Sequence, residues 1–277
     1  MRIGLMVHGR REDAVCQARK AAACLQAQGV AVTAEDDAVP LLGEGVVSFS
    51  RAHGADVIVT LGGDGTLLRG AQYALRWDAS LLGVNMGRVG FLAEIEPDML
   101  EDALAAVVSG HYRTENRPVL EVRCGEKTWY GLNDVVISRG GYSRLITLDA
   151  LVDGDSTGRY VADGLIVATP TGSTGYSLSA GGPVVSPKVD CMVITPICAP
   201  TLQHRPCVVH GGAHIRLSLV AEDVQRASLE VDGQSCAELH GGTTVDVRKD
   251  GRALRLIRMR DARFFQTVRD KLTEWTR

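Results

Sequence analysis

The sequence predicts an α/β fold, in which a Rossmann-like N-terminal domain is followed by a β-rich C-terminal domain. Strand and helix patterns alternate over the first hundred residues, which is typical of a doubly wound parallel sheet. From about Arg113 apolar residues recur with a period of two between Gly-containing turns, which indicates many short strands. A helical pattern over Ala262–Trp275 ends the chain, and we expect this helix to return to the first domain. The expected domains are residues 1–98 plus about 261–277, and residues 99–260.

The elements of the first domain follow from local composition. Val57–Leu61 is an apolar, β-branched run, as expected of a strand inside a parallel sheet. Glu12–Gln28 is rich in Ala, Gln, Arg and Leu and is closed by Gly29, which predicts a helix. The other expected elements are strands over Arg2–His8, Val30–Thr33 and Leu81–Val84, a helix between Leu61 and Leu81, and a helix over Pro97–Gly110.

Alternating apolar residues define the strands of the second domain. They predict strands over Val119–Arg123, Asp134–Ser138, Leu145–Val152, His214–Leu219, Ser228–Val231 and Thr244–Val247.

Composition narrows the class of protein. A chain of 277 residues with 45% hydrophobic and 23% charged residues is typical of a soluble globular protein. The net charge of -3 gives no general electrostatic case for nucleic acid or an anionic membrane. No segment approaches the ~18 apolar residues of a membrane span, and Met1–His8 favours a strand over a signal peptide. The seven cysteines form no Cys-x-x-Cys pair, so we expect reduced thiols and a cytoplasmic protein.

A glycine-rich loop, Gly62–Thr66, follows the strand Val57–Leu61 and precedes a segment that can begin a helix. Glycines let the backbone approach an anion closely, and a helix N-terminus offers unpaired N–H groups. Asp64 would repel phosphate unless a metal ion or a hydroxyl donor lies between them. The loop therefore predicts chemistry on a phosphate, with an ordinary turn as the alternative; its residues fit neither a P-loop nor the dinucleotide fingerprint.

A second glycine loop, Asn85–Leu92, follows the strand Leu81–Val84. Because the carboxyl ends of neighbouring parallel strands lie at one edge of a sheet, we expect the two glycine loops to face one crevice.

Three further groups of polar residues are candidates for ligand binding. The amide and carboxylate of Asn133–Asp134 can hold both hydroxyls of a ribose, with a solvated strand end as the alternative. Asp163–Gly164 leads through an apolar strand into Thr169–Pro183, a loop of small donors in which the aromatic Tyr176 suits contact with a base. His210 and His214 are separated by Gly211–Ala213 and share no helix, so we do not expect them to bind a metal together.

In their order along nearly the whole chain, these motifs resemble those of bacterial NAD kinases. The Gly62–Thr66 motif alone also resembles that of diacylglycerol and sphingoid-base kinases and, loosely, phosphofructokinases; Thr169–Pro183 is the specific motif. The resemblance extends over Asn85–Gly87, Gly90–Leu92, Asn133–Asp134, Asp163–Gly164, Thr201–Leu202, Arg205–Pro206 and the Asp232–Gln234 turn.

The resemblance implies that ATP phosphorylates the 2′-hydroxyl of the adenosine ribose of NAD, giving NADP. It also implies a divalent cation, and Mg²⁺ is the expected one. It implies Asp64 as the proton acceptor and a homo-oligomer, dimer or tetramer, and it assigns no protein side chain to the metal. The residues that it implies for nucleotide and substrate binding are Gly62, Gly63, Gly65, Thr66, Arg69, Phe91, Asn133, Asp134, Arg144, Val161, Asp163, Thr174, Gly175, Tyr176, Ser177, Leu178, Ser179 and Gln234.

The chain departs from this pattern at three places, which bear on the NAD and subunit contacts. Val161–Ala162 stands where relatives often have an arginine, Gly175 replaces a common alanine, and Pro200 replaces a frequent histidine. Two alternative functions remain: a lipid kinase that shares the first motif, and a non-catalytic NAD(P)-binding sensor on the same fold. The lack of a membrane-docking segment disfavours the first, and a carboxylate at Asp64 disfavours the second.

Overall fold

The computed structural model describes residues 1–9, 11–87, 90–141, 144–200, 204–221, 226–260 and 264–274. The chain forms two compact units, residues 1–116 with 254–277, and residues 117–253. Their boundaries fall within strands β6 (Arg113–Cys124) and β17 (Thr244–Arg258). The first unit extends past the expected residue 98 because helix α5 (Leu100–Ser109) buries Leu100 and Leu104 in its core.

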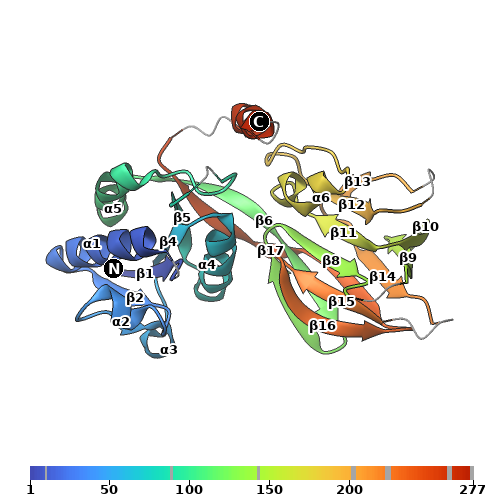
Figure 1. Cartoon of the computed structure of the whole chain (residues 1–277), viewed down its shortest axis with the longest axis horizontal. Coiled ribbons are helices and arrows are strands. Elements are labelled where there is room, and N and C mark those ends of the chain that lie inside the picture. The colour runs from blue at the N-terminus through green and yellow to red at the C-terminus, as the bar shows by residue number, and fades with distance from the viewer. Residues whose placement is uncertain are drawn as a thin grey trace. The chain divides into compact units, whose positions relative to one another are not determined.

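The first unit contains a parallel sheet in the strand order β5-β4-β1-β2-β3. Helices α1 and α5 cover one face and α4 covers the other (Figure 1), which confirms the doubly wound arrangement. The strands of this sheet and the elements that connect them are β1 (Arg2–Val7), α1 (Glu12–Ala27), β2 (Ala31–Ala34), α2 (Val39–Leu42), β3 (Val47–Ser48), α3 (Phe49–Ala52), β4 (Val57–Gly62), α4 (Asp64–Trp77), β5 (Ser80–Asn85) and the 3₁₀ turn η1 (Pro97–Met99).

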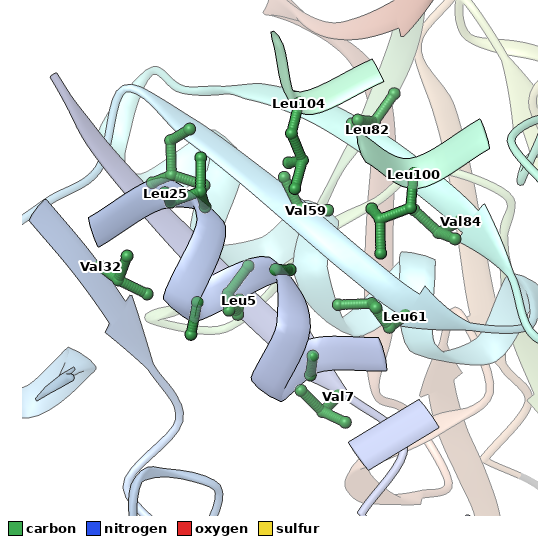
Figure 2. Packing of buried hydrophobic residues seen from close by; sticks show 14 of the residues in the cluster. Leu5, Val7, Leu25, Val32, Val59, Leu61, Leu82, Val84, Leu100 and Leu104 are labelled. Atoms are coloured by element: carbon green, nitrogen blue, oxygen red, sulfur yellow. The ribbon is translucent and has the colours of Figure 1, made fainter. Parts of the chain in front are cut away.

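The core of the first unit shows why β4 is apolar throughout. Successive side chains of a strand point to opposite faces, so Val59 and Leu61 pack beneath α1 and α5 while Ile58 lies on the face of α4. Figure 2 shows Leu25 of α1 and Leu104 of α5 over this first face. Both faces of the sheet are covered, so its carboxyl edge is left to the loops.

The second unit is built from antiparallel strands in two sheets that share one apolar core. One sheet has the order β13-β12-β11-β8-β15-β16, and the other contains β10, β9, β14, β17, β6 and β7. The elements are β7 (Lys127–Gly131), β8 (Asp134–Ser138), β9 (Ile146–Val152), β10 (Asp155–Ala162), β11 (Gly164–Ala168), η2 (Gly172–Thr174), α6 (Tyr176–Ser179), β12 (Cys191–Ile197), β13 (Cys207–His210), β14 (Ile215–Leu219), β15 (Arg226–Val231) and β16 (Gln234–His240).

The C-terminal segment belongs to the first unit, as the sequence predicts. Arg255 and Leu256 at the end of β17 pair in parallel with Ser80 and Leu81 of β5. Helix α7 (Phe264–Glu274) follows, and its Lys271 lies over the Phe91 ring, with Nζ 4.2 Å from the ring centroid. None of the helices described is long and apolar enough to cross a membrane.

Candidate active site

The glycine loop adopts the predicted strand–turn–helix geometry. β4 ends at Gly62, Gly63 caps α4, and α4 begins at Asp64. The carbonyl of Gly63 accepts hydrogen bonds from the N–H groups of Thr66 and Leu67, at 3.0 and 3.1 Å. Asp64 therefore lies in the first turn of α4, where the helix dipole stabilises a negative charge.

The second glycine loop holds the Asp64 carboxylate. Phe91 N–H donates to Oδ2 at 2.8 Å, and the N–H groups of Leu92 and Ala93 donate to Oδ1 at 3.2 and 3.4 Å. A Cβ added at Gly90 would lie 1.9 Å from Asp64 Oδ1, so this close approach requires glycine. The two loops therefore meet, and backbone donors fix the orientation of the carboxylate; Arg88 and Val89 lie outside the described residues.

Arg69, on the same helix, is held by a residue that the sequence analysis missed. Its Nη2 donates to Glu35 Oε2 at 2.9 Å and to the Val7 carbonyl at 3.4 Å. Burial raises the pKa of Glu35, and the charge of Arg69 acts against this rise. Glu35 follows β2, 34 residues before Arg69, and no local pattern could have linked the two.

In the second unit, Asn133 and Asp134 lie at the start of β8, beside the small-residue loop. Asn133 Oδ1 is buried and has no hydrogen-bond partner among the described residues, and Asp134 is only 5% exposed. A Cβ added at Gly175 would lie 3.7 Å from Asn133 Nδ2 and 3.8 Å from Asp134 Oδ2. The structure thus brings these predicted residues together, with a buried acceptor that a donor from a ligand could satisfy.

The loop after β11 presents some of its side chains and buries others. Ser177 Oγ lies 2.8 Å from Thr195 Oγ1, and the buried Thr174 donates to the Thr171 carbonyl. Tyr176, in contrast, is 47% exposed, and Ser179 is also exposed. Tyr176 is therefore not a core residue, and its ring is available for contact with a base.

The remaining predicted site residues of the second unit are half-buried or exposed. Asp163 Oδ1 accepts a hydrogen bond from Arg139 Nε at 2.6 Å, a partner that the sequence analysis did not identify. Arg144, Val161 and Gln234 are exposed, the last at the start of β16, and Leu178 is half-buried. The Thr201–Leu202 part of the resemblance lies outside the described residues.

Acidic neighbours surround Asp134. Burial, followed by the charges of Asp232 and Glu230, raises the pKa of Asp134 to about 7. This folded-state pKa exceeds 3.8, the ordinary value of an aspartate side chain, so the contribution of Asp134 to stability is complete only below pH 3.8. The contribution, on the order of 4 kcal/mol, is lost as the pH rises to about 7.

We therefore expect the parent protein to lose stability between pH 5 and pH 8, and Asp134→Asn to lose less, because an amide carries no charge at either pH. Urea midpoints of both proteins at the two pH values measure this. Equal losses in parent and variant would contradict the assignment to Asp134.

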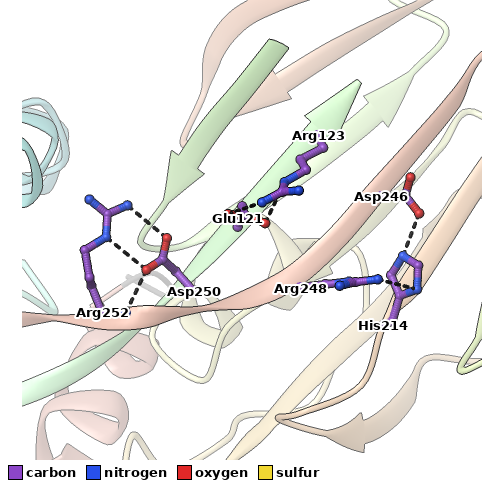
Figure 3. Close-up of polar contacts among 7 residues, drawn as sticks. All are labelled: Glu121, Arg123, His214, Asp246, Arg248, Asp250 and Arg252. Atoms are coloured by element: carbon purple, nitrogen blue, oxygen red, sulfur yellow. Dashed lines mark hydrogen bonds and ion pairs between the residues drawn. The ribbon is translucent and has the colours of Figure 1, made fainter. Parts of the chain in front are cut away.

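Among the described residues, no cluster of three His, Cys, Asp or Glu side chains is arranged to hold a metal ion. His210 and His214 contact different carboxylates: His210 Nε2 lies 2.9 Å from Asp153 Oδ2, and His214 Nε2 lies 2.6 Å from Asp246 Oδ1. Figure 3 shows His214 between Asp246 and Arg248. All seven cysteines are free thiols.

Two protein-family models match the chain, one in its N-terminal part and one in its C-terminal part. Residues 3–112 match the ATP-NAD kinase N-terminal domain, and residues 132–259 match the ATP-NAD kinase C-terminal domain. An NAD kinase of Magnetococcus marinus is 43% identical over 225 residues, which cover 79% of this chain and 74% of that protein. The chain belongs to the NAD kinase family.

Solved structures show the same NAD kinase fold. A crystal structure of yeast NADH kinase complexed with NADH matches with a TM-score of 0.87 at 25% identity, covering 99% of this chain and 87% of that one. An NAD kinase from Archaeoglobus fulgidus in complex with ATP matches with a TM-score of 0.77 at 27% identity, covering 99% of both chains.

Proposed function

We propose that this NAD kinase transfers the γ-phosphoryl group of ATP to the 2′-hydroxyl of the adenosine ribose of NAD, with Asp64 as general base. Both family models and the identity to curated NAD kinases support the activity. The observation that carries the role of Asp64 is its geometry. It is a carboxylate at a helix N-terminus, beside glycines, and three backbone N–H groups orient it.

In the proposed reaction Asp64 accepts the proton of the 2′-hydroxyl as that oxygen forms a bond to the γ-phosphorus. The bond between the γ-phosphorus and its bridging oxygen breaks, and ADP leaves. Backbone N–H groups at the start of α4 stabilise phosphate charge. Three donors occupy part of the carboxylate, but its two oxygens offer about four acceptor sites, which leaves one for the hydroxyl.

A divalent cation fits this site through the nucleotide. Mg²⁺ commonly keeps several waters and binds substrate phosphates, so it would be held mainly by the nucleotide, because three N–H groups and the hydroxyl occupy the acceptor sites of Asp64. When bound, the cation neutralises phosphate charge. We further propose that the protein is cytoplasmic and forms a homo-oligomer. Light scattering of the purified protein tests the oligomeric state.

The second unit is proposed to bind NAD. Asn133 and Asp134 hold a ribose, and the neighbouring exposed residues of the small-residue loop complete the site. The buried, unsatisfied Asn133 Oδ1 and the proximity of Gly175 support this assignment.

Tyr176→Ala is expected to raise the KM for NAD by about tenfold, because stacking of a base on an aromatic ring contributes about 1 to 3 kcal/mol. The KM for ATP should change less, and Tyr176→Phe should retain the parental KM for NAD. Steady-state kinetics and thermal melts check both variants. A lower melting temperature with an unchanged KM for NAD would show a structural role instead.

The acceptor is tested by offering NAD, diacylglycerol and sphingosine separately with ATP and magnesium, and measuring ADP release. We expect ADP and NADP in equal amounts with NAD alone. ADP release with a lipid would support the lipid kinase alternative, and NAD binding without ADP release would support the sensor.

A further inference from the structure

A half-buried carboxylate in a hairpin turn reaches the start of β8. Asp232 and Gly233 connect β15 to β16, and their φ angles of 49° and 73° are those of a two-residue type I′ turn. A turn of this type normally exposes its aspartate, but burial here raises the pKa of Asp232, while three backbone donors act against the rise. A carboxylate that is partly removed from water needs compensating hydrogen bonds.

The compensation comes from a segment about a hundred residues earlier in the chain. The N–H groups of Asn133 and Asp134 donate to Asp232 Oδ1 at 2.7 and 3.2 Å, and Leu132 N–H donates to Oδ2 at 2.8 Å. The backbone of Asp232 donates in turn to the Asp134 carbonyl at 3.0 Å. Four hydrogen bonds therefore fix the backbone from which the Asn133 and Asp134 side chains project.

We infer that Asp232 is a positioning residue for NAD: its carboxylate fixes the backbone of Leu132–Asp134 and thereby aims the side chains of Asn133 and Asp134. The inference rests on the proposed role of those two residues in binding NAD. Asp232 itself need not touch the nucleotide. The same turn also places Gln234, the first residue of β16.

The charge of Asp232 has a second effect on the same pair. After burial, it is the largest cause of the raised pKa of Asp134, ahead of Glu230. Removing the Asp232 charge should therefore shift the titration of Asp134 to lower pH, an effect that turn geometry alone would not produce.

Asp232→Asn is the decisive variant, because Asn-Gly is a favoured type I′ turn and preserves the hairpin. The amide loses the negative charge and one of the two acceptor oxygens. We expect the KM for NAD to rise about 10- to 100-fold, the KM for ATP to change less than about twofold, and the pH midpoint of NAD binding to fall.

The matched control is Asp153→Asn. Asp153 also precedes a glycine in a two-residue turn, between β9 and β10, and its carboxylate accepts a backbone hydrogen bond from His214. Asp153 lies outside the proposed site, so this variant should keep the parental KM for NAD.

Steady-state kinetics, NAD calorimetry across pH 5 to 9 and thermal melts of the three proteins complete the test. A parental KM and dissociation constant for NAD in Asp232→Asn would overturn the inference. So would an equal rise of both KM values with a lower melting temperature, which indicates general loss of structure, or the same NAD defect in Asp153→Asn. Failure of the proposed function is distinct, because the parent itself would then form no NADP or bind no NAD.

Discussion

Asp64→Asn is expected to lower kcat by about 10² to 10⁴-fold, the usual contribution of a positioned general base. This corresponds to roughly 3 to 5 kcal/mol of barrier. The amide nearly preserves the shape of the side chain but cannot accept the hydroxyl proton. NAD affinity should change little, because Asp64 acts on the reacting hydroxyl. Steady-state kinetics at saturating substrates, with calorimetry for NAD, measures both quantities.

A matched control lies at the other end of α4. Asp78, the C-cap residue, has a side chain that is 88% exposed and pairs with Arg255. Asp78→Asn should keep the parental kcat. If Asp64 mainly holds the metal ion, high magnesium should partly restore Asp64→Asn. A variant with near-parental kcat at ordinary magnesium would contradict both roles.

Gly172→Ala is expected to lower the free energy of unfolding of the second unit by about 3 kcal/mol. This is near the upper end of the cost that is typical when a side chain is added at a tightly packed position. The added Cβ would lie 2.1 Å from the Asn133 carbonyl oxygen and 2.8 Å from Asn133 Cα. These are backbone atoms, and the same carbonyl accepts a hydrogen bond from Thr169 N–H. Neither atom can move without disturbing the proposed NAD site. Urea denaturation measures the loss.

Gly175→Ala provides the comparison within the same loop. Its Cβ would approach no atom more closely than 3.3 Å, and its φ of -94° is accessible to alanine. We expect its free energy of unfolding to stay within about 1 kcal/mol of the parent. Equal losses in the two variants would show that the loop, and not the contact with Asn133, limits stability.

The fold was predictable where a run of residues repeats its pattern. Val57–Leu61 and the helix over Glu12–Gln28 are recovered in β4 and α1, because burial on both faces and helical composition leave clear local signals. β10 was missed because its first residues are polar and exposed. β12 was missed although it is buried throughout; Pro196 within it argues against a strand on sequence alone.

The site was predictable as a set of motifs but not as a set of contacts. The sequence predicts a helix that follows the glycine turn Gly62–Thr66, and in the structure α4 begins within that turn, at Asp64. Nothing in the sequence shows that the N–H groups of Phe91–Ala93 orient its carboxylate, because loop conformations depend on tertiary packing. The hydrogen bond from Asn133 N–H to the Asp232 carboxylate joins residues that are 99 positions apart, so no local sequence pattern predicts it either.

The most direct test follows the phosphorus atoms during the reaction. Phosphorus NMR of the parent protein with NAD, ATP and magnesium resolves ATP, ADP, free phosphate and a sugar phosphomonoester. We predict that the γ-phosphate signal of ATP declines as one phosphomonoester, on the 2′-oxygen of the adenosine ribose, appears in equal amount with ADP. ADP with free phosphate alone, or a phosphomonoester at another position, would contradict the proposed function.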